Sequence, residues 1–302
     1  MNPAASPHTH APQADAPAGL SRWTPGADAA APPPGSAVRL YARPSANFAD
    51  KLQATEALLR QAAAQHRHPD GRWAVTQASS LGAEDVVITH LINRLGLGIP
   101  VFVLETGALH PETLALLAAE RADAQAPGRA PITVYTPQHE AVVQFVAREG
   151  ADAMVRSVAL RKACCGLRKL EPLARALEGH TAWITGLRRE QSSARADVPP
   201  IDTSEQAQTG RVKYNPLADW TWGDVWHCIA QDGVRYNPLH DRFFPSIGCA
   251  PCTRAITLGE DFRSGRWWWE DESAKECGLH VAATPTATSA TTPTAPTPND
   301  AP

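Results

Sequence analysis

Apolar and polar positions follow one another along the chain in blocks that predict short buried strands separated by helices. A first helix is predicted over 48–65, with Leu52, Leu58 and Leu59 on its apolar side. Strands are predicted at 73–78, 99–104, 132–135 and 182–185, and helices at 83–95, 111–121 and 139–148. Strands that are apolar throughout and alternate with helices indicate a mostly parallel sheet with helices on both faces. The sequence therefore predicts an α/β fold that binds ligands at the carboxyl ends of its strands.

The two ends of the chain differ from this body in composition. Residues 1–37 contain eight prolines, and residues 281–302 are almost wholly Ala, Thr and Pro, with five prolines. Such segments lack the apolar residues that would offset the loss of conformational entropy on ordering. We predict two disordered tails, and one folded domain over 38–280 whose last segment, from about residue 264, is mobile.

Charge and composition exclude several classes of protein. The net charge of −3 argues against a dedicated nucleic-acid binder. No apolar run of about 18 residues predicts a membrane span, and the N-terminus lacks the pattern of a secretory signal. Six cysteines are too few for a disulfide scaffold in a chain of 302 residues. We expect a soluble cytoplasmic protein, and the sequence leaves open whether it forms a homo-oligomer.

Small and polar residues follow the first predicted strand, in the segment Ser-Ser-Leu-Gly-Ala-Glu-Asp at 79–85. Ser79, Ser80 and Gly82 allow close approach of an anion to the backbone N–H groups at the start of a helix. An ordinary N-cap without a ligand explains the serines equally well. The segment is not a Walker loop, because no Gly-Lys-Ser/Thr follows it.

Two further strand ends carry candidate ligands for an anion. The second strand runs into a turn with Thr106 and His110, which by itself is also an ordinary strand–helix connection. The fourth strand is followed by Arg188, Arg189 and Arg195. Exposed arginines are usually solvated, but three of them just past a strand end favour a clamp for phosphate or sulfate oxygens.

Four of the cysteines form two close pairs, Cys164-Cys165 and Cys249-Ala-Pro-Cys252. A lone buried cysteine is usually a small apolar residue, but two such pairs point to a metal. Adjacent cysteines fit poorly around one tetrahedral zinc ion, whereas an iron–sulfur cubane accepts neighbouring ligands on different irons. We therefore favour iron–sulfur over zinc, with Lys169 near both the metal and the anion.

The other two cysteines differ in their surroundings. Cys228 lies beside an apolar helical stripe and is expected to be a packed, inert thiol. Cys277 lies between Lys275 and His280, which could lower its pKa and make it a nucleophile. An accidental exposed thiol is the alternative. The tryptophans at 267–269 are expected to anchor the C-terminal segment on the body.

These motifs together resemble those of the assimilatory adenylyl-sulfate reductases. The resemblance covers roughly residues 45–280 and rests on five ordered segments: 79–85, 105–113, 164–169, 249–254 and 275–280. The chain departs from the family pattern at Ala108, where the family often has Arg, and at Glu105, where it has Asp. The first departure puts a side-chain contact at that position in doubt, but not the reaction.

The resemblance implies an adenine nucleotide α-hydrolase-like fold with a modified pyrophosphate loop, and a [4Fe–4S] cluster on Cys164, Cys165, Cys249 and Cys252. It implies that Cys277 attacks adenosine 5′-phosphosulfate to give an S-sulfocysteine and AMP, and that thioredoxin then releases sulfite. The implied phosphosulfate contacts are Lys169, Arg188, Arg195, Arg263, Arg266 and His280. Asp85 and Thr106 are implied to lie by the nucleoside.

Three other functions are alternatives to this one. A reductase of the 3′-phosphorylated substrate usually lacks the paired cysteines, with exceptions. An ATP-dependent sulfurtransferase acting on RNA should show Ser-Gly-Gly-x-Asp-Ser in the first loop and a more basic body, and this chain shows neither. A metal-stabilised binding module would leave Cys277 and His280 unexplained.

Overall fold

The structure is a computed structural model that describes residues 33–257 and 259–271. Its centre is a six-stranded sheet in the order β3-β2-β1-β4-β6-β5, in which β5 is antiparallel to β6 and all other pairs are parallel. The strands are β1 (Val75–Ser79), β2 (Val101–Leu104), β3 (Ile132–Tyr135), β4 (Ala182–Ile184), β5 (Ile201–Asp202) and β6 (Val212–Tyr214). This is the α/β architecture that the sequence predicts.

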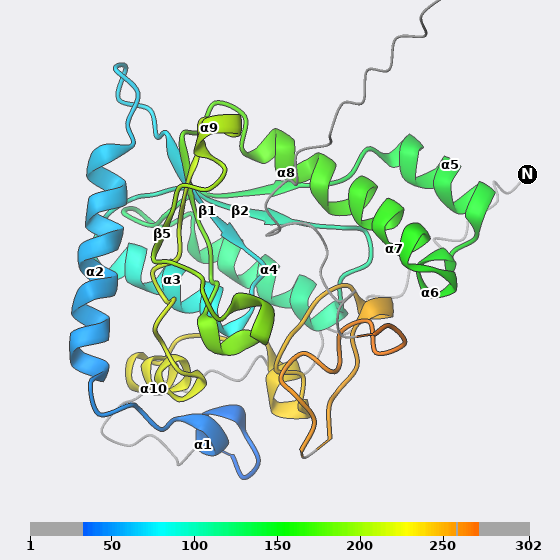
Figure 1. Ribbon diagram of the computed structural model, residues 1–302. Helices are drawn as coiled ribbons and strands as arrows, with labels where there is room; N and C mark the ends of the chain where they lie inside the picture. The colour runs from blue at the N-terminus through cyan, green and yellow to red at the C-terminus, as the bar shows by residue number, and fades with distance from the viewer. Residues whose placement is uncertain (1–32, 258, 272–302) are drawn as a thin grey trace, which may run out of the picture.

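Helices cover both faces of the sheet (Figure 1). The longer ones on one side are α2 (Phe48–Gln65), α3 (Ala83–Arg94), α4 (Pro111–Asp123) and α10 (Trp222–Asp232). The other side carries α5 (His139–Glu149), α6 (Ala153–Arg156), α7 (Val158–Cys165) and α8 (Glu171–Ala176). Short helices α1 (Ala37–Tyr41) and α9 (Gln206–Thr209) complete the set.

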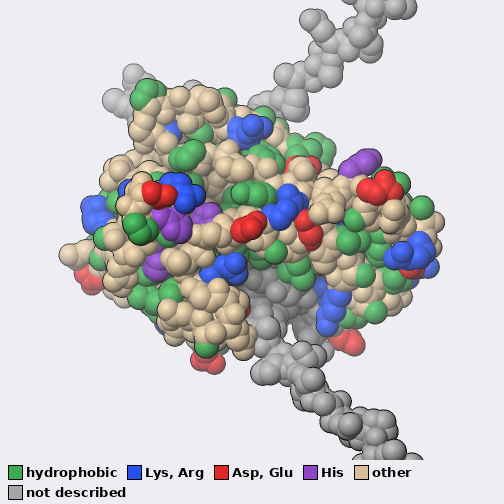
Figure 2. Space-filling model, turned by 90° about the horizontal axis from the view of Figure 1, so that it is seen from above, with side chains coloured by type: hydrophobic (Ala, Val, Ile, Leu, Met, Phe, Trp, Pro, Cys, Tyr) green, Lys and Arg blue, Asp and Glu red, His purple; other side chains and the backbone are tan. Residues whose placement is uncertain are grey.

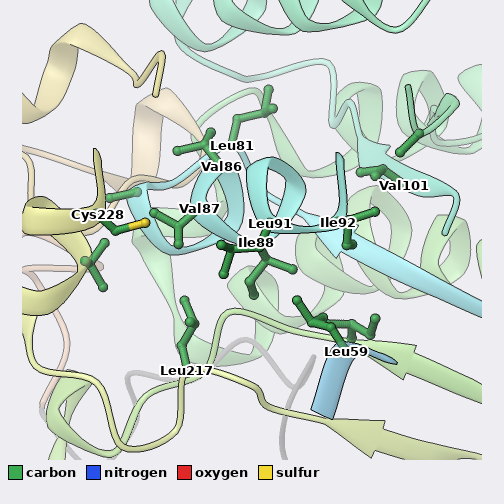
Figure 3. Packing of buried hydrophobic residues seen from close by; sticks show 14 of the residues in the cluster. Leu59, Leu81, Val86, Val87, Ile88, Leu91, Ile92, Val101, Leu217 and Cys228 are labelled. Carbon is green, nitrogen blue, oxygen red and sulfur yellow. The ribbon is translucent and has the colours of Figure 1, made fainter. Parts of the chain in front are cut away.

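Alternate residues of the strands supply the two cores. Val101 and Val103 pack with α2, α3 and α10 in the larger core, whereas Phe102 packs with α8 on the opposite face. The larger core contains Leu59 from α2, Ile88 and Leu91 from α3, and Cys228 from α10 (Figure 3). Burial of apolar residues on both faces explains why these strands read as apolar throughout.

The strand order reverses between β1 and β4. From β1 the chain continues outward through α3 to β2 and through α4 to β3, and it then returns on the opposite face to β4. Ligands of open α/β sheets bind at such a switch point, outside the carboxyl ends of the strands. The loops after β1 and β4 therefore mark the place for a site.

The predicted elements are confirmed to within about two residues, and the helix at 48–65 is confirmed at both ends. Helices α1, α6, α7, α8 and α9 and strands β5 and β6 were not predicted. Residues 33–37, which we assigned to the N-terminal tail, belong to the described part, where Ser36 caps α1 and Ala37 is buried. No helix of the described residues is long and apolar enough to cross a membrane.

Candidate active site

A cavity of about 200 Å³ lies at the carboxyl ends of β1, β2 and β4. Most of the residues expected to bind substrate line it: Ser79, Ser80, Gly82, Asp85, Thr106, Lys169, Arg195, Arg263 and Arg266. Apolar side chains, among them Phe102, Leu104 and Trp183, line another part of the cavity. Cys277 and His280 lie outside the described residues.

The loop after β1 does not use its serines as an ordinary helix cap. The N-cap of α3 is Gly82, without a side-chain cap bond, and Leu81 adopts the left-handed backbone conformation with φ of 62°. Ser79 Oγ accepts a hydrogen bond from the Leu81 N–H at 3.2 Å. The simple N-cap interpretation of Ser79 and Ser80 is therefore wrong, and the start of α3 faces the cavity without a side-chain cap.

Asp85 holds this loop from within α3. One carboxylate oxygen accepts hydrogen bonds from both the N–H and the Oγ of Ser80, each at 2.6 Å. Gly186, at the end of β4, leaves no room for a side chain here, because a Cβ would lie 2.4 Å from Asp85 Oδ1. Burial raises the pKa of Asp85 to about 6, although the hydrogen bonds from Ser80 act in the opposite direction. Asp85 thus joins the two loops of the switch point.

Arg188 is placed differently from the expectation that it contacts phosphosulfate. It is fully buried and does not line the cavity. Its Nε donates to Glu84 Oε1 at 2.9 Å, and its Nη1 donates to Glu190 and to the Trp220 carbonyl. Because a buried guanidinium needs a carboxylate partner, Arg188 fixes the loop after β4 to the first turn of α3. Arg189 is partly exposed and pairs with Asp219, also away from the cavity.

Arg266 is the most buried of the cations that line the cavity. Its guanidinium stacks on the Trp267 ring at 4.6 Å and lies against Gly248, where a Cβ would come within 2.4 Å of Nη2. Its Nη1 donates to Ser246 Oγ at 3.3 Å, whereas its buried Nε has no hydrogen-bond partner in the described structure. A buried donor without a partner is costly. The cavity therefore offers a donor site for an anion.

Three further cations surround the same space. Lys169, Arg195 and Arg263 are half-buried and line the cavity with Arg266. They come from a π-helical turn after α7, from the loop after β4, and from the C-terminal segment. Cations converging from three parts of the chain favour a ligand with several negative charges.

A second cavity, of about 80 Å³, lies beside the first and is lined by all four paired cysteines. Cys164 and Cys165 end α7, and the following turn, Gly166–Leu170, is a π-helix. Cys249 and Cys252 approach from the other side, and each of the four is at most 8% exposed. Cys249, Lys169 and Trp267 line both cavities. The candidate metal ligands and the candidate anion ligands therefore line two adjacent cavities that share these three residues.

The thiols differ in how readily they ionise. Burial acts to raise the pKa of Cys249, but Lys169, Thr106 and Arg266 together lower it below its usual value. Burial raises the pKa of Cys164, and it raises the pKa of Cys252 to about 12. Cations beside these thiols, Lys169 and Arg168 among them, favour the thiolate form that a metal requires.

The chemistry of the four cysteines suits a thiolate-bound group. Within the described residues, no three His, Cys, Asp or Glu side chains are grouped closely enough to hold one metal ion. The four thiols nevertheless line one cavity. Four cysteines spread around a cavity suit a cubane cluster, which takes one thiolate on each iron.

The turn after β2 forms part of the wall between the cavities. Thr106 Oγ1 lies 3.3 Å from Cys249 Sγ, and the Ala250 N–H donates to the Ala108 carbonyl at 2.7 Å. Arg168 Nη1 donates to the Thr106 carbonyl at 2.7 Å. Ala108, where the family often has Arg, lines the cysteine cavity. Arg168, in the π-helical turn that follows α7, therefore holds the turn after β2 in place.

Cys228, the tryptophans at 267–269 and His110 differ in how they are placed. Cys228 is confirmed as a packed thiol, since it is 2% exposed and burial raises its pKa to about 12. Trp267 is confirmed as an anchor at 1% exposure, but Trp268 is 43% exposed. His110 does not line the anion cavity.

Several functional candidates were missed. Glu84 and Gln191 join the two loops, and Arg161 lines the cysteine cavity while fully buried. A signal existed for Arg161, because a position three residues before Cys164 shares its helical face. Glu84 belongs to the first loop motif, but its partners lie more than 100 residues away in the sequence.

Figure 2 shows one face of the molecule, where acidic and basic side chains are interspersed. Neither sign of charge dominates this face, in keeping with the small net charge of −3 of the whole chain. The cations described above are instead concentrated at the two cavities.

Named relatives share sequence or fold with most of this chain. An adenosine 5′-phosphosulfate reductase of Allochromatium vinosum is 52% identical over 207 residues, covering 68% of this chain and 78% of the relative. One from Burkholderia cepacia is 48% identical over 236 residues, covering 78% and 89%. The solved phosphoadenylyl-sulfate reductase of Candida auris, a phosphate complex, superimposes with a TM-score of 0.52 at 25% identity, covering 65% of this chain and 88% of that one.

The fold is accordingly the adenine nucleotide α-hydrolase-like fold that the resemblance implied. A family model described as the phosphoadenosine phosphosulfate reductase domain matches residues 74–255, which include the loops after β1, β2 and β4 and all four paired cysteines. The chain belongs to the phosphoadenosine phosphosulfate reductase family.

Proposed function

We propose that this protein reduces adenosine 5′-phosphosulfate to sulfite and AMP, as an enzyme of sulfate assimilation that supplies cysteine biosynthesis. One observation carries the proposal: a cationic cavity at the switch point shares Cys249, Lys169 and Trp267 with a cavity of four cysteines. Relatives named adenosine 5′-phosphosulfate reductases, at 48–52% identity, support it.

The lining of the anion cavity suits an adenylylated sulfate. The apolar walls from Phe102, Leu104 and Trp183 can enclose a flat base. Lys169, Arg263 and Arg266 can bind the phosphosulfate, whose oxygens carry the negative charge. The uncapped start of α3, behind Ser79 and Ser80, supplies backbone donors for the same anion.

In the proposed first step, the Cys277 thiolate attacks the sulfur of the substrate. A bond forms between Cys277 Sγ and the sulfo group, the bond from that sulfur to the phosphate oxygen breaks, and AMP leaves with the electron pair. Cations around the phosphate stabilise the charge that develops on the leaving oxygen. His280 is proposed to assist binding. This step requires no reductant.

In the proposed second step, a dithiol of thioredoxin removes the sulfo group. One thioredoxin thiolate attacks Cys277 Sγ and expels sulfite, and the second resolves the mixed disulfide, so that Cys277 returns as a thiolate and thioredoxin is oxidised. Sulfur is thereby reduced from sulfate to sulfite by two electrons.

We further propose that Cys164, Cys165, Cys249 and Cys252 hold a [4Fe–4S] cluster. Their burial and their common cavity support a thiolate-bound metal group, and the adjacency of Cys164 and Cys165 favours the cluster over a single zinc ion. When bound, the cluster would supply a charged, redox-active iron–sulfur group next to the anion cavity. The presence of both cysteine pairs also favours the 5′-phosphosulfate over its 3′-phosphorylated form as substrate.

The test is incubation of anaerobically purified protein with each nucleotide and reduced thioredoxin. Sulfite and AMP should form from adenosine 5′-phosphosulfate at a higher kcat/KM than sulfite and the 3′,5′-bisphosphate form from the other nucleotide. The reverse preference would support the alternative, a reductase of the 3′-phosphorylated substrate, which is the substrate named in the family description and for the Candida auris protein.

A second measurement isolates the nucleophile. Without reductant, the protein should release one AMP per active chain and gain one sulfo group on the peptide that contains Cys277. Cys277→Ser should lose both events and keep its nucleotide affinity, whereas Cys228→Ser should behave as the parent. Sulfite formation by Cys277→Ser at the parent rate would contradict the mechanism.

A further inference from the structure

We propose that Gln191 is a positioning residue that sets the Arg195 guanidinium in the anion cavity. The inference rests on the proposed function, because it assumes that the cavity takes an adenine nucleotide. Gln191 lies in a short 3-10 turn, Arg189–Gln191, after β4 and lines the cavity at 9% exposure.

Every hydrogen-bonding group of the Gln191 amide is engaged. Its Nε2 donates to Glu84 Oε1 and to the Gly186 carbonyl, both at 3.0 Å. Its Oε1 accepts from the Arg188 N–H at 3.1 Å and from Arg195 Nη1 at 2.7 Å. A side-chain amide offers two donors and two acceptor sites, so this set is complete.

The partners also fix which way the amide points. The two acceptors, Glu84 and the Gly186 carbonyl, face the nitrogen, and the two donors face the oxygen. The reversed amide would oppose donor to donor and acceptor to acceptor on both sides. The carboxylate of Glu84, itself paired with buried Arg188, therefore determines where Gln191 presents an acceptor to Arg195.

This chain of bonds connects α3 to the loop after β4. Glu84 belongs to the first turn of α3, and Arg195 ends the 3-10 turn Ser193–Arg195. Arg195 and Ser80 of the serine loop both line the cavity. A positioned guanidinium contributes more to anion binding than one that samples many rotamers, because less entropy is lost on binding. Gln191 therefore acts on the nucleotide through Arg195.

The test is a double-mutant cycle on the full, anaerobically purified protein, with AMP as the probe and calorimetry as the readout. Gln191→Met keeps the length of the side chain and removes its hydrogen bonds. We expect it to weaken AMP binding roughly tenfold, the size of a lost hydrogen bond to a charged group. Arg195→Ala should weaken binding by at least as much.

The decisive comparison is the double variant. Gln191→Met should cause no further loss of AMP affinity once Arg195 is Ala, since its effect passes through that guanidinium. Losses that multiply fully in the double variant would overturn the proposal, as would parent-like affinity of either single variant. Gln144→Met is the matched control, because Gln144 bonds Glu140 on the exposed face of α5, and it should bind AMP as the parent does.

Two measurements keep the outcome interpretable. If Gln191→Met unfolds at a lower temperature than the parent, the cycle is repeated with Gln191→Ala below both transitions, with the same expected non-additivity. Substrate kinetics provide the second measurement: Gln191→Met should raise KM for adenosine 5′-phosphosulfate, and Arg195→Ala should make that effect vanish. AMP binding by the parent without sulfite formation would reject the proposed function while leaving the cycle valid.

Discussion

Arg161 and Glu270 form a doubly hydrogen-bonded ion pair beside the cysteine cavity. Nε donates to Oε1 at 2.7 Å and Nη2 to Oε2 at 2.8 Å, and the two side chains are 0% and 3% exposed. The Arg161 guanidinium also stacks on the Trp267 ring at 4.6 Å, and the Arg266 guanidinium contacts the same ring at the same distance. One ion pair therefore ties the segment that carries the cavity arginines to the helix that carries Cys164 and Cys165.

Removal of the charge of Glu270 should destabilise the protein. Glu270→Gln keeps the shape of the side chain but leaves a buried guanidinium without its carboxylate, which costs about 3–5 kcal/mol of the free energy of unfolding. Anaerobic urea unfolding, followed by circular dichroism, measures the loss. Glu171→Gln breaks the exposed pair with Arg175 and should cost less than about 1 kcal/mol. Equal losses in the two variants would contradict the structural assignment.

Removal of cations from the anion cavity should slow the reaction. Lys169→Ala, Arg263→Ala and Arg266→Ala should each lower kcat/KM by the equivalent of about 2–4 kcal/mol, because charge-assisted hydrogen bonds strengthen as charge builds on the leaving phosphate. Steady-state sulfite formation measures the effect. Arg189→Ala, outside the cavity, is the control and should keep kcat/KM near that of the parent. Parent-like kinetics for all three cavity variants would show that the anion binds elsewhere.

The paired cysteines should account for bound iron. Protein purified anaerobically should contain about four irons per chain. It should also show a broad absorbance band at about 400 nm, as thiolate-bound cubanes do. Cys249→Ser should lose most of this iron, whereas Cys228→Ser, a change at a buried thiol outside the cavity, should retain it. One zinc per chain and no iron would refute the cluster assignment.

The titration of Asp85 should appear in the dependence of stability on pH. Burial raises its pKa to about 6, so the folded state favours the protonated carboxyl relative to the unfolded chain. The stability that this contributes is present below about pH 4 and is lost as the pH rises through about 6, up to about 3 kcal/mol. The free energy of unfolding of Asp85→Asn, measured relative to that of the parent, should therefore rise between about pH 4 and 6. Above about pH 6 this difference should stay constant.

Urea unfolding at a series of pH values checks this expectation. A stability difference for Asp85→Asn that is constant with pH would mean that Asp85 does not titrate as described.

The parts of the site that were predictable from the sequence are those with a local signal. Ser79, Ser80 and Asp85 follow an apolar strand and precede a helix, and the cysteine pairs are visible as pairs. Strand β6 escaped prediction because it has three residues, and its middle one, Lys213, is a buried cation stacked over Trp183 and paired with Asp202. A charged residue inside so short a strand removes the apolar pattern.

The role of Arg188 was beyond prediction for a different reason. Its position after β4 is the same in the sequence as that of a substrate ligand, and only its burial against Glu84, 104 residues earlier, shows that it acts inside the protein. Local patterns report which face of an element is apolar, but they do not report which distant charge neutralises a given arginine. The same limit explains why Gln191 was missed.

Gly248 has no side chain, yet a screen for loss of activity should recover substitutions of it together with substitutions of the cavity cations. The guanidinium of Arg266 occupies the space where any other residue at position 248 would place its first side-chain carbon. A single methyl group there would displace a cavity cation, and it would do so next to Cys249 in the backbone that both cavities share. Random mutagenesis should therefore recover Gly248→Ala as an apparent charge-deletion variant, with the kinetics of Arg266→Ala.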